Sequence, residues 1–325
     1  MSMSTTAPEK YHKLPDGRTL AYSESGDASS TTLIIFFHGA FGVGNASNPP
    51  RVLVEGDFHF VAPTLPGWGK SSPRNKQIPY HLSFPADIAS LIEQAHPLKE
   101  DTKIYLSGGS YGTVPAQVLY GAPFDVFPPG CHVAGCLILA PFSPFKLHKE
   151  YKNDMTLQNY LAVGPPSQYI PFNLIARLGS LALGHKFKTR EQTEAFIRET
   201  FFNKMGDEER AAFTKWSQDN DRTEAQVERD LGDNMYRSVE ETWDGFLEIS
   251  NIIHGDWGFN PGSLDEDHAK RPIVIVASEG DTMAPDGMAK WLAATYKKAH
   301  FRSVSGGHLA SLFHLNDLWK DLLAM

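Results

Sequence analysis

A serine within a run of glycines is the residue whose type and spacing most directly indicate chemistry in this sequence. Ser110 lies in the run Gly108-Gly109-Ser110-Tyr111-Gly112, after the apolar segment KIYLS and before a segment with helical spacing. A serine on a sharp turn between a strand and a helix needs small residues two positions away on each side, because larger side chains would collide with the neighbouring backbone. The pattern therefore predicts an exposed nucleophilic serine on such a turn.

A serine hydroxyl is a poor nucleophile unless a base removes its proton, and that base is oriented by an acid. His308 lies in SVSGGHLASLF, after the last predicted strand and before the C-terminal helix, and two glycines precede it. His300 falls at the start of a predicted strand and His314 inside a predicted helix, which favours solvated or structural roles for both. The sequence therefore predicts His308 as the base.

The acid is expected at the carboxyl end of a buried parallel strand, where the sites of open α/β sheets gather. Asp281 directly follows the apolar segment PIVIVASEG. Glu279 and Asp286 lie in the same region and are competing carboxylates, which would otherwise be solvated loop residues. We assign Asp281 as the acid that orients the histidine.

A second glycine-bearing loop, HGAFG, follows the first buried strand. An oxyanion that forms during attack by a serine is held by backbone N–H groups from the nucleophile turn and from such a loop. We assign these donors to Tyr111 and Ala40, with Phe41 as the alternative to Ala40. Gly39 and Phe41 are the predicted substrate-binding residues, and the Phe41 side chain either faces the pocket or packs beneath the inserted helices. His38 is interpreted as a structural histidine.

Continuous apolar runs predict the strands that must position these residues. Such runs are expected when a parallel sheet is covered on both faces. The predicted strands are 32–39, 58–67, 103–110, 132–141, 272–281 and 300–308, and the helical patterns between them are 83–98, 110–121 and 284–299. Asp16-Gly17 between two short alternating segments adds an N-terminal β-hairpin. The expected fold is α/β, with a doubly wound, mostly parallel sheet.

The alternation of strands and helices stops after Pro141 and resumes only near Arg271. We therefore predict a core domain of residues 1–145 and 269–325 and a mainly helical cap, or lid, domain of residues 146–268. Helical spacing in the cap occurs over 189–202, 207–218 and 239–253, and the Pro- and Gly-bearing stretches 161–172 and 257–272 are expected to be loops. Most cap aromatics are expected to be buried core: Tyr160, Tyr169, Phe172, Phe201, Trp216, Trp243 and Phe246.

The charge is concentrated in the predicted cap. The chain has 325 residues and a net charge of −8, and the cap holds 14 Lys and Arg against 22 Asp and Glu, so the remainder is neutral. Binding of nucleic acid needs a basic surface, so this composition argues against a nucleic-acid partner.

The cysteine content and the hydropathy pattern bear on the compartment. Cys131 and Cys136 are the only cysteines, both near the apolar run GCLILAP, and they are expected to be buried thiols. The N-terminal MSMSTTAPEK has no apolar run, and no stretch reaches the roughly 18 consecutive apolar residues of a membrane-spanning helix. We expect a cytoplasmic protein with no membrane partner.

Taken together, these motifs resemble the α/β-hydrolase superfamily with a helical cap. The matching segments are HGAFG, LPGWGKS, GGSYG, SEGDTMAP and SGGH, and Ser110, Asp281 and His308 follow the family order of serine, acid and histidine. The resemblance implies a serine hydrolase that cleaves a carboxylic ester or a related acyl bond of a small molecule, ester or amide, without a metal or an organic cofactor.

Two departures from the family pattern are visible. Thr64 stands where many relatives have an aspartate before LPG, and HGAFG replaces the Gly-Gly-Pro-Gly stretch that is usual in relatives of the proline iminopeptidase type. The second departure weakens an aminopeptidase interpretation, which nevertheless stays an alternative. Cleavage of a carbon–carbon bond and a ligand receptor built on the hydrolase fold are further alternatives. The sequence leaves the substrate and the oligomeric state open.

Overall fold

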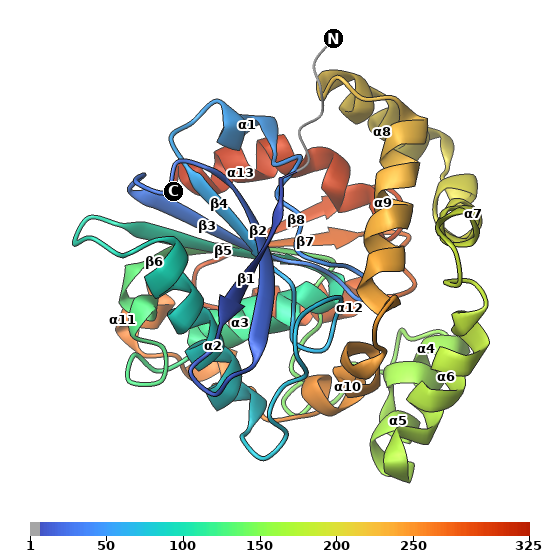
Figure 1. Cartoon of the computed structure of the whole chain (residues 1–325), viewed down its shortest axis with the longest axis horizontal. Helices are drawn as coiled ribbons and strands as arrows, with labels where there is room; N and C mark the ends of the chain where they lie inside the picture. Colours follow the sequence, from blue (N-terminus) through green and yellow to red (C-terminus); the bar gives the residue numbers. More distant parts are fainter. Residues whose placement is uncertain (1–6) are drawn as a thin grey trace.

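The computed structural model describes residues 7–325, so the first six residues, on which the expectation of no export signal partly rests, lie outside it. Its centre is one sheet with the strand order β1-β2-β4-β3-β5-β6-β7-β8 (Figure 1). β2 is antiparallel to both β1 and β4, and the other neighbours are parallel. The strands are β1 (Glu9–Lys13), β2 (Thr19–Gly26), β3 (Thr32–Phe37), β4 (His59–Pro63), β5 (Lys103–Gly109), β6 (Val133–Leu139), β7 (Ile273–Ser278) and β8 (Ala299–Val304).

Helices cover both faces of this sheet, which explains the continuous apolar runs. In β3, Leu33, Ile35 and Phe37 are buried with residues of α2, α3 and α12, whereas Ile34 is buried on the opposite face with residues of α1 and α13. The covering helices are α1 (Arg51–Val54), α2 (Tyr80–Ala95), α3 (Thr113–Gly121), α12 (Asp286–Thr295) and α13 (Leu315–Leu323). Because successive strand side chains point to opposite faces, both sets must be apolar. The predicted fold class is confirmed.

The predicted N-terminal hairpin is present. β1 and β2 pair in antiparallel register, and Gly17 in the turn between them has a φ of +87°, a conformation that favours glycine. Arg18, at the end of this turn, donates two hydrogen bonds of 2.8 and 2.6 Å to the carboxylate of Asp87 on α2. This bidentate pair ties the hairpin to the helix layer of the core.

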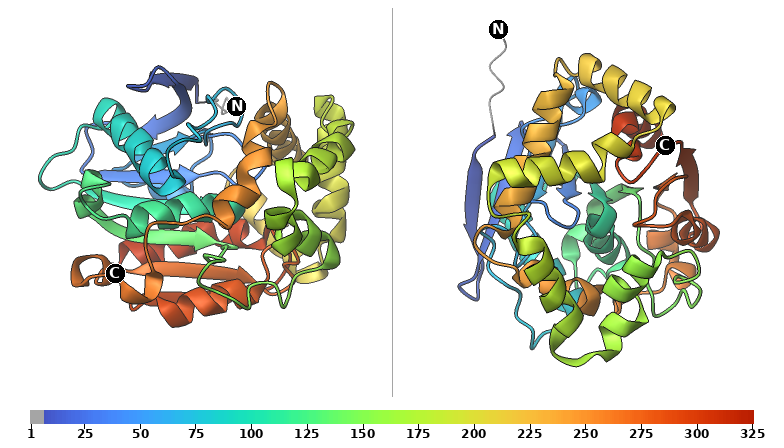
Figure 2. Two further views of the ribbon diagram at one scale, coloured as in Figure 1. Left: turned by 90° about the horizontal axis from the view of Figure 1, so that it is seen from below. Right: turned by 90° about the vertical axis from the view of Figure 1, so that its right-hand side faces the viewer.

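Between β6 and β7 the described chain contains helices and no strand, and all of these helices except the last, which precedes β7, gather beside the carboxyl ends of the parallel strands (Figures 1 and 2). They are α4 (Leu157–Val163), α5 (Pro165–Tyr169), α6 (Leu174–Gly184), α7 (Arg190–Thr200), α8 (Asp207–Asp219), α9 (Glu224–Val239), α10 (Asp244–Ile253) and α11 (Glu266–Ala269). The helical patterns predicted over 189–202, 207–218 and 239–253 correspond to α7, α8 and α10. The inserted segment is thus mainly helical, as predicted.

The prediction of a loop over 161–172 was wrong, because α4 and α5 occupy most of it. Pro165 and Pro166 are the first two residues of α5, where proline is tolerated because these N–H groups have no partner in the helix anyway. The second predicted loop, 257–272, contains only the short helix α11 and one 3₁₀ turn.

Helix α9 was also missed, although the sequence carries a signal for it. The side chain of Thr223 accepts a hydrogen bond from the N–H of Gln226, whose own side chain accepts one from the N–H of Thr223. This capping box of Thr and Gln three residues apart is a recognised start of a helix.

Of the cap aromatics, most of which were expected to be core, Phe201, Trp216, Trp243 and Phe246 pack against buried clusters. Tyr169 and Phe172 are exceptions, because they are 77% and 87% exposed. The expectation of two buried cysteines was wrong for one of them. Cys136 is buried in β6, but Cys131 is exposed, because it lies in the turn before that strand; both are free thiols.

Candidate active site

Ser110 lies on a sharp turn at the carboxyl end of β5. Its φ is +53°, in the left-handed region that residues other than glycine rarely adopt. A β-carbon on Gly108 would lie 2.2 Å from the carbonyl oxygen of Gly112, and a β-carbon on Gly112 would lie 2.1 Å from the carbonyl oxygen of Phe37. A β-carbon on Gly109, by contrast, would meet no atom within 4 Å. The two glycines that the motif requires are therefore the two positions at which this turn has no room for a side chain.

His308 and Asp281 are in direct contact. Nδ1 of His308 lies 2.7 Å from Oδ2 of Asp281, and His308 donates this hydrogen bond because a carboxylate only accepts. Oδ1 of Asp281 accepts the N–H groups of Met283 and Ala284 at 2.8 and 3.0 Å. The carboxylate is buried and fixed by its own loop, and it fixes the imidazole with Nε2 available to act as a base.

The competing carboxylates have other partners. Glu279 accepts a hydrogen bond of 3.1 Å from Ser303, and Asp286 forms an ion pair of 2.6 Å with Lys290. Neither is hydrogen-bonded to His308 in the described part of the chain. Of the three acids that follow β7, Asp281 is thus the one that the fold brings to the histidine.

The loops of Asp281 and His308 follow the parallel strands β7 and β8, so they lie at the same carboxyl end of the sheet as Ser110 after β5. The N–H of Gly280 donates a hydrogen bond of 2.8 Å to the carbonyl of Gly306, which joins the loops after β7 and β8. Within residues 7–325, no hydrogen bond joins Ser110 to His308. Hydrogen bonds of this kind are often long before substrate binds. His300 lies in β8, as predicted, whereas His314 ends a 3₁₀ turn just before α13.

The loop that contains Ala40 lies beside the serine turn. A β-carbon on Gly39 would lie 3.2 Å from the carbonyl oxygen of Gly109 and 3.3 Å from Cβ of Ser110. The N–H of Tyr111 belongs to the first turn of a helix, where N–H groups have no partner within the helix. The fold therefore brings together the predicted donor residues Tyr111 and Ala40 and the predicted substrate-binding residue Gly39.

Phe41 is the centre of an aromatic cluster. Its ring centroid lies 5.0 Å from that of Phe187 and 5.1 Å from that of Phe246, and Trp68 and Trp243 follow at 5.6 and 6.0 Å. Phe187, Trp243 and Phe246 belong to the inserted segment. The side chain of Phe41 was predicted either to face the pocket or to pack beneath the inserted helices, and the structure shows the second arrangement.

His38 is built into the loop as a structural residue. Its Nδ1 donates a hydrogen bond of 2.7 Å to the carbonyl of Gly39, and its Nε2 accepts one of 2.9 Å from the N–H of Leu65. Burial lowers the pKa of His38 to about 4. The ring is therefore neutral near pH 7 and joins the ends of β3 and β4.

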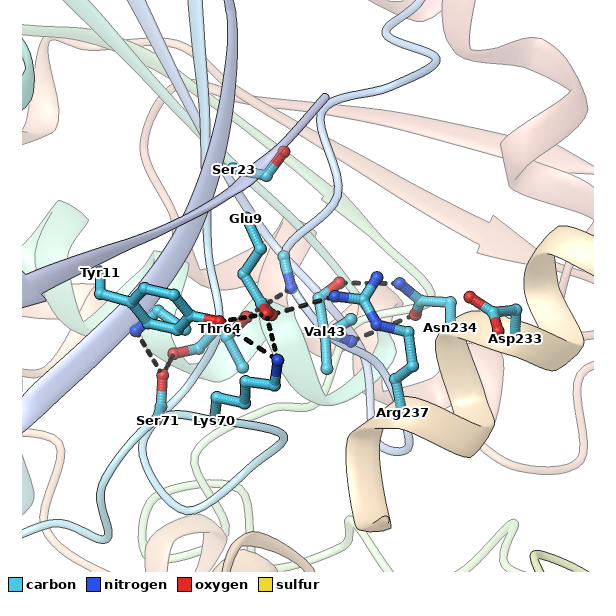
Figure 3. Close-up of polar contacts among 12 residues, drawn as sticks. Glu9, Tyr11, Ser23, Val43, Thr64, Lys70, Ser71, Asp233, Asn234 and Arg237 are labelled. Carbon is cyan, nitrogen blue, oxygen red and sulfur yellow. Dashed lines mark hydrogen bonds and ion pairs between the residues drawn. The ribbon is translucent and has the colours of Figure 1, made fainter. Parts of the chain in front are cut away.

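Sequence reasoning missed a clamp between α9 and the loop after β3 (Figure 3). The side chain of Asn234 accepts a hydrogen bond of 3.1 Å from the N–H of Val43 and donates one of 3.0 Å to its carbonyl. One turn further along α9, Arg237 binds Glu9 at 3.0 Å, and Lys70 reaches the same carboxylate at 3.3 Å. No local pattern reveals these contacts, because the partners are far apart in sequence.

A polar network beneath the serine turn was missed as well. Thr113 donates a hydrogen bond of 2.7 Å to the carbonyl of Ser110 and accepts one of 3.1 Å from the N–H of Phe142. The side chain of Gln117 donates a hydrogen bond of 2.9 Å to the carbonyl of Phe142 and accepts one of 3.2 Å from the hydroxyl of Tyr296. These buried groups fix the nucleophile turn to the end of β6 and to the residue that follows α12.

Two residues of the inserted segment reach the histidine loop. The ring of Phe201 lies with its centroid 6.4 Å from that of His308, and a β-carbon on Gly306 would lie 2.7 Å from Cδ of Glu209. Glu209 is buried, yet in residues 7–325 its carboxylate has no hydrogen bond or ion pair. The only sequence signal for it was the acidity of the segment as a whole.

A shallow hollow that Tyr111 helps to line lies between the loop after β4 and α10. Its wall includes Glu248, which binds Arg74 and Lys76, each at 2.8 Å. Burial alone would raise the pKa of Glu248, but Lys76 and Arg74 outweigh it and lower the pKa. Ser110 and His308 do not line this hollow. Among residues 7–325, no group of three or more His, Cys, Asp or Glu side chains is placed to hold a metal ion.

Comparisons with known proteins agree with this architecture. A sequence profile described as the alpha/beta hydrolase family matches residues 34–318. Similar solved structures include an esterase from Exiguobacterium antarcticum, with a TM-score of 0.58, 14% identity and 98% of each chain covered. A bromoperoxidase from Bacillus anthracis has a TM-score of 0.57 and 13% identity over 98% of this chain and 100% of that chain.

A hydrolase from Pseudomonas aeruginosa has a TM-score of 0.56 and 14% identity, again over 98% of each chain. At these identities the likeness concerns the fold. No curated protein sequence matches this chain.

Proposed function

The chain belongs to the alpha/beta hydrolase family, and from this premise we propose that it is a serine hydrolase that cleaves a carboxylic ester or a related acyl bond. One observation carries the proposal. The serine on the strained turn after β5 shares its sheet edge with a histidine whose Nδ1 is 2.7 Å from a buried aspartate. A structural histidine has no need of that combination.

In the proposed mechanism, Nε2 of His308 removes the proton of Ser110 as its Oγ attacks the carbonyl carbon of the substrate. Asp281 holds the ring with Nδ1–H toward the carboxylate and stabilises the imidazolium. The N–H groups of Tyr111 and Ala40 hold the negative oxygen of the tetrahedral intermediate. The imidazolium then protonates the leaving group. In the second half, Nε2 of His308 removes a proton from water as the water attacks the acyl-enzyme, and the imidazolium returns that proton to Oγ of Ser110 as the acid leaves.

Residues 146–268 form the cap in this proposal, and they choose the substrate. Phe187, Trp243 and Phe246 cover Phe41 next to the serine turn, so an acyl group that enters there meets an aromatic wall. We infer an apolar acyl group on a small-molecule ester or amide. The chemistry needs no metal or organic cofactor.

The test combines covalent labelling with turnover. A fluorophosphonate probe, read by intact mass and peptide mapping, should label wild type once, at Ser110. Ser110→Ala should lose both the label and the hydrolysis of p-nitrophenyl esters, by at least roughly 10³-fold. Ser303→Ala, an exposed serine on β8, is the control and should behave as wild type. If Ser110→Ala hydrolyses esters as well as wild type, the proposal is wrong and a receptor with the hydrolase fold becomes the better explanation.

Glu209 favours a second candidate, an aminopeptidase of the proline iminopeptidase type. The carboxylate of Glu209 beside the histidine loop has no hydrogen-bond or ion-pair partner among residues 7–325, so it is available to bind a substrate amine. Glu248, by contrast, is already neutralised by Arg74 and Lys76.

The two candidates are separated by comparing a prolyl arylamide with an aryl ester of a simple acid. If the second candidate holds, the arylamide is the faster substrate, and Glu209→Gln raises its KM at least roughly tenfold without affecting the ester. Inactivity on every prolyl substrate removes this candidate and leaves the esterase proposal intact.

A further inference from the structure

The helices α4, α5 and α6 expose an unusual amount of apolar surface. Eight of the fourteen large apolar side chains that are exposed in the described part of the chain lie between residues 157 and 181. We call the following six the apolar cap face: Leu157, Tyr169, Phe172, Leu174, Leu178 and Leu181. Monomeric proteins expose single apolar residues commonly, but a contiguous group of this kind marks an interaction surface.

Helix α6 has two different faces. Leu174, Leu178 and Leu181 follow one another at spacings of four and three, so they form a single outward stripe, and Leu181 is 76% exposed. On the inner side, a β-carbon on Gly179 would lie 3.4 Å from the ring of Phe246 on α10. α4, α5 and α6 lie side by side at the outer edge of the molecule (Figure 1). The outward stripe has no partner within the described chain.

The charge around the apolar cap face is opposite to that of the rest of the cap. Residues 155–190 contain no Asp or Glu, whereas residues 191–268 contain 20 of them against 7 Lys and Arg. The bases within the acid-free stretch are Arg177, Lys186, Lys188 and Arg190. Arg190 pairs with Asp233, but the other three bases have no carboxylate partner among the described residues. Arg177 donates a hydrogen bond to the backbone carbonyl of Phe172, the residue with the most exposed aromatic side chain in the described part of the chain, so the cation lies within the apolar segment.

From these observations we propose that the apolar cap face docks on a lipid surface with anionic headgroups. Leucine and aromatic side chains enter the boundary of headgroups and acyl chains, and neighbouring lysine and arginine side chains bind the phosphates. A second copy of the chain fits less well, because a two-fold contact through this face would bring Arg177 and its symmetry mate to the same small area.

The docking is peripheral. Among residues 7–325, no helix is both long and apolar enough to cross a bilayer. The earlier expectation of no membrane partner was drawn from the lack of such a span, which does not bear on a helix that lies on the surface.

The docked face adjoins the candidate active site. Asn159 on α4 donates a hydrogen bond to the carbonyl of Thr282, in the loop of Asp281. Gly179 on α6 packs on Phe246, which contacts Phe41 beside the serine turn. If the proposed hydrolase function holds, this arrangement brings esters dissolved in a membrane to the catalytic serine. The docking itself does not depend on that function.

The test is co-sedimentation of the full-length Ser110→Ala protein with vesicles, so that binding is measured without turnover. Vesicles of phosphatidylcholine with about one third phosphatidylglycerol should bind it, and neutral vesicles or about 0.5 M salt should weaken binding. Leu178→Asp with Leu181→Asp in the same background should lower the partition coefficient at least roughly tenfold. Val54→Asp, a large exposed apolar residue on α1, is the matched control and should bind normally.

Three results would overturn the proposal. One is the absence of binding to anionic vesicles, and another is unchanged binding of the double variant, provided its circular dichroism matches that of the Ser110→Ala background. The third is a dimer of the background protein, seen by light scattering, that the double variant dissociates. That result would make the face a contact between copies of the chain. Because Ser110→Ala is used throughout, failure of docking and failure of the hydrolase proposal are separate outcomes.

Discussion

Three carboxylates follow β7 within eight residues, and their surroundings distinguish them. Asp281 is buried, accepts two backbone N–H groups and contacts His308, whereas Glu279 and Asp286 bind surface partners. In the sequence, residue type and position alone made Glu279 and Asp286 alternatives to Asp281 as the acid. Only the path of the loop, which turns Asp281 inward, separates them.

Replacing Asp281 by Asn should therefore remove most of the activity. The amide keeps the volume but no longer fixes the tautomer of His308, and kcat should fall by roughly 10³- to 10⁴-fold with little change in KM. Steady-state kinetics on a p-nitrophenyl ester measure this. Asp286→Asn should stay within about twofold of wild type. Equal losses in both variants would mean that Asp281 acts only through the stability of the loop.

At the scale of elements, α9 connects the inserted segment to the loop after β3, which carries one of the proposed oxyanion donors. Asn234 binds both backbone polar groups of Val43, just after the loop that carries Ala40, and Arg237 anchors the same helix to Glu9 (Figure 3). A loop that must present an N–H group within a few tenths of an ångström benefits from such a clamp. We assign Asn234 as a positioning residue.

Asn234→Ala should lower kcat roughly tenfold or more while KM changes little, because the displaced N–H group is proposed to stabilise only the oxyanion of the transition state. Asn234→Asp, which keeps the acceptor but not the donor, should fall between wild type and Asn234→Ala. Tyr236→Phe, on the same helix, loses only an exposed contact with Glu240 and serves as the control. A drop in thermal stability without a change in kcat would contradict the assignment.

At the scale of the whole molecule, buried histidines make stability depend on pH. Burial is the main cause that lowers the pKa of His38 and of His96, each to about 4. Nδ1 of His96 lies 3.0 Å from Nδ1 of His59, whose pKa is lowered by burial as well. Both rings are buried in the core beside β4, so protonation disrupts this contact.

A lowered pKa in the native state means that the unfolded chain binds the proton more readily. The stabilisation from these histidines is fully present above pH 6.5 and is lost as the pH falls toward 4. Between pH 7 and pH 5 the free energy of unfolding should drop by about 2 kcal/mol for each of the two histidines. Urea unfolding at both pH values measures the drop.

His96→Asn removes one of these histidines. The drop in its free energy of unfolding between pH 7 and pH 5 should therefore be smaller than that of wild type by about 2 kcal/mol. His185→Asn, at an exposed position, should follow wild type. A His96→Asn protein with the full drop would show that other groups cause the acid sensitivity.

Much of the core was predictable because its local signals and its global fold agree. Every predicted strand occurs, since a sheet buried on both faces needs continuous apolar runs. The motif around Ser110 and the loops of Asp281 and His308 were predictable because each directly follows a strand of one sheet. The triad as a catalytic unit, and the domain bounds, stay predictions.

The cap was less predictable for physical reasons. The spacing of apolar residues predicted α7, α8 and α10, but it did not identify α4, α5, α6 and α9. α5 begins with two prolines that resemble a loop, and the leucine stripe of α6 faces outward instead of into a core. Asn234 and Glu209 act across long sequence separations, which no local pattern encodes.

Three residues beyond the carboxyl ends of β3, β5 and β6 have a left-handed backbone although none is a glycine. The φ angles of Phe41, Ser110 and Ala140 are +58°, +53° and +48°. Each such residue costs on the order of 1 kcal/mol. Ser110→Gly should therefore unfold in urea with a free energy about 1 kcal/mol above that of Ser110→Ala, and equal values would show that the turn is relaxed. The carboxyl end of the sheet is then held in a conformation that opposes folding. Under the proposed function, selection for heat resistance alone would tend to relax the turn on which catalysis depends.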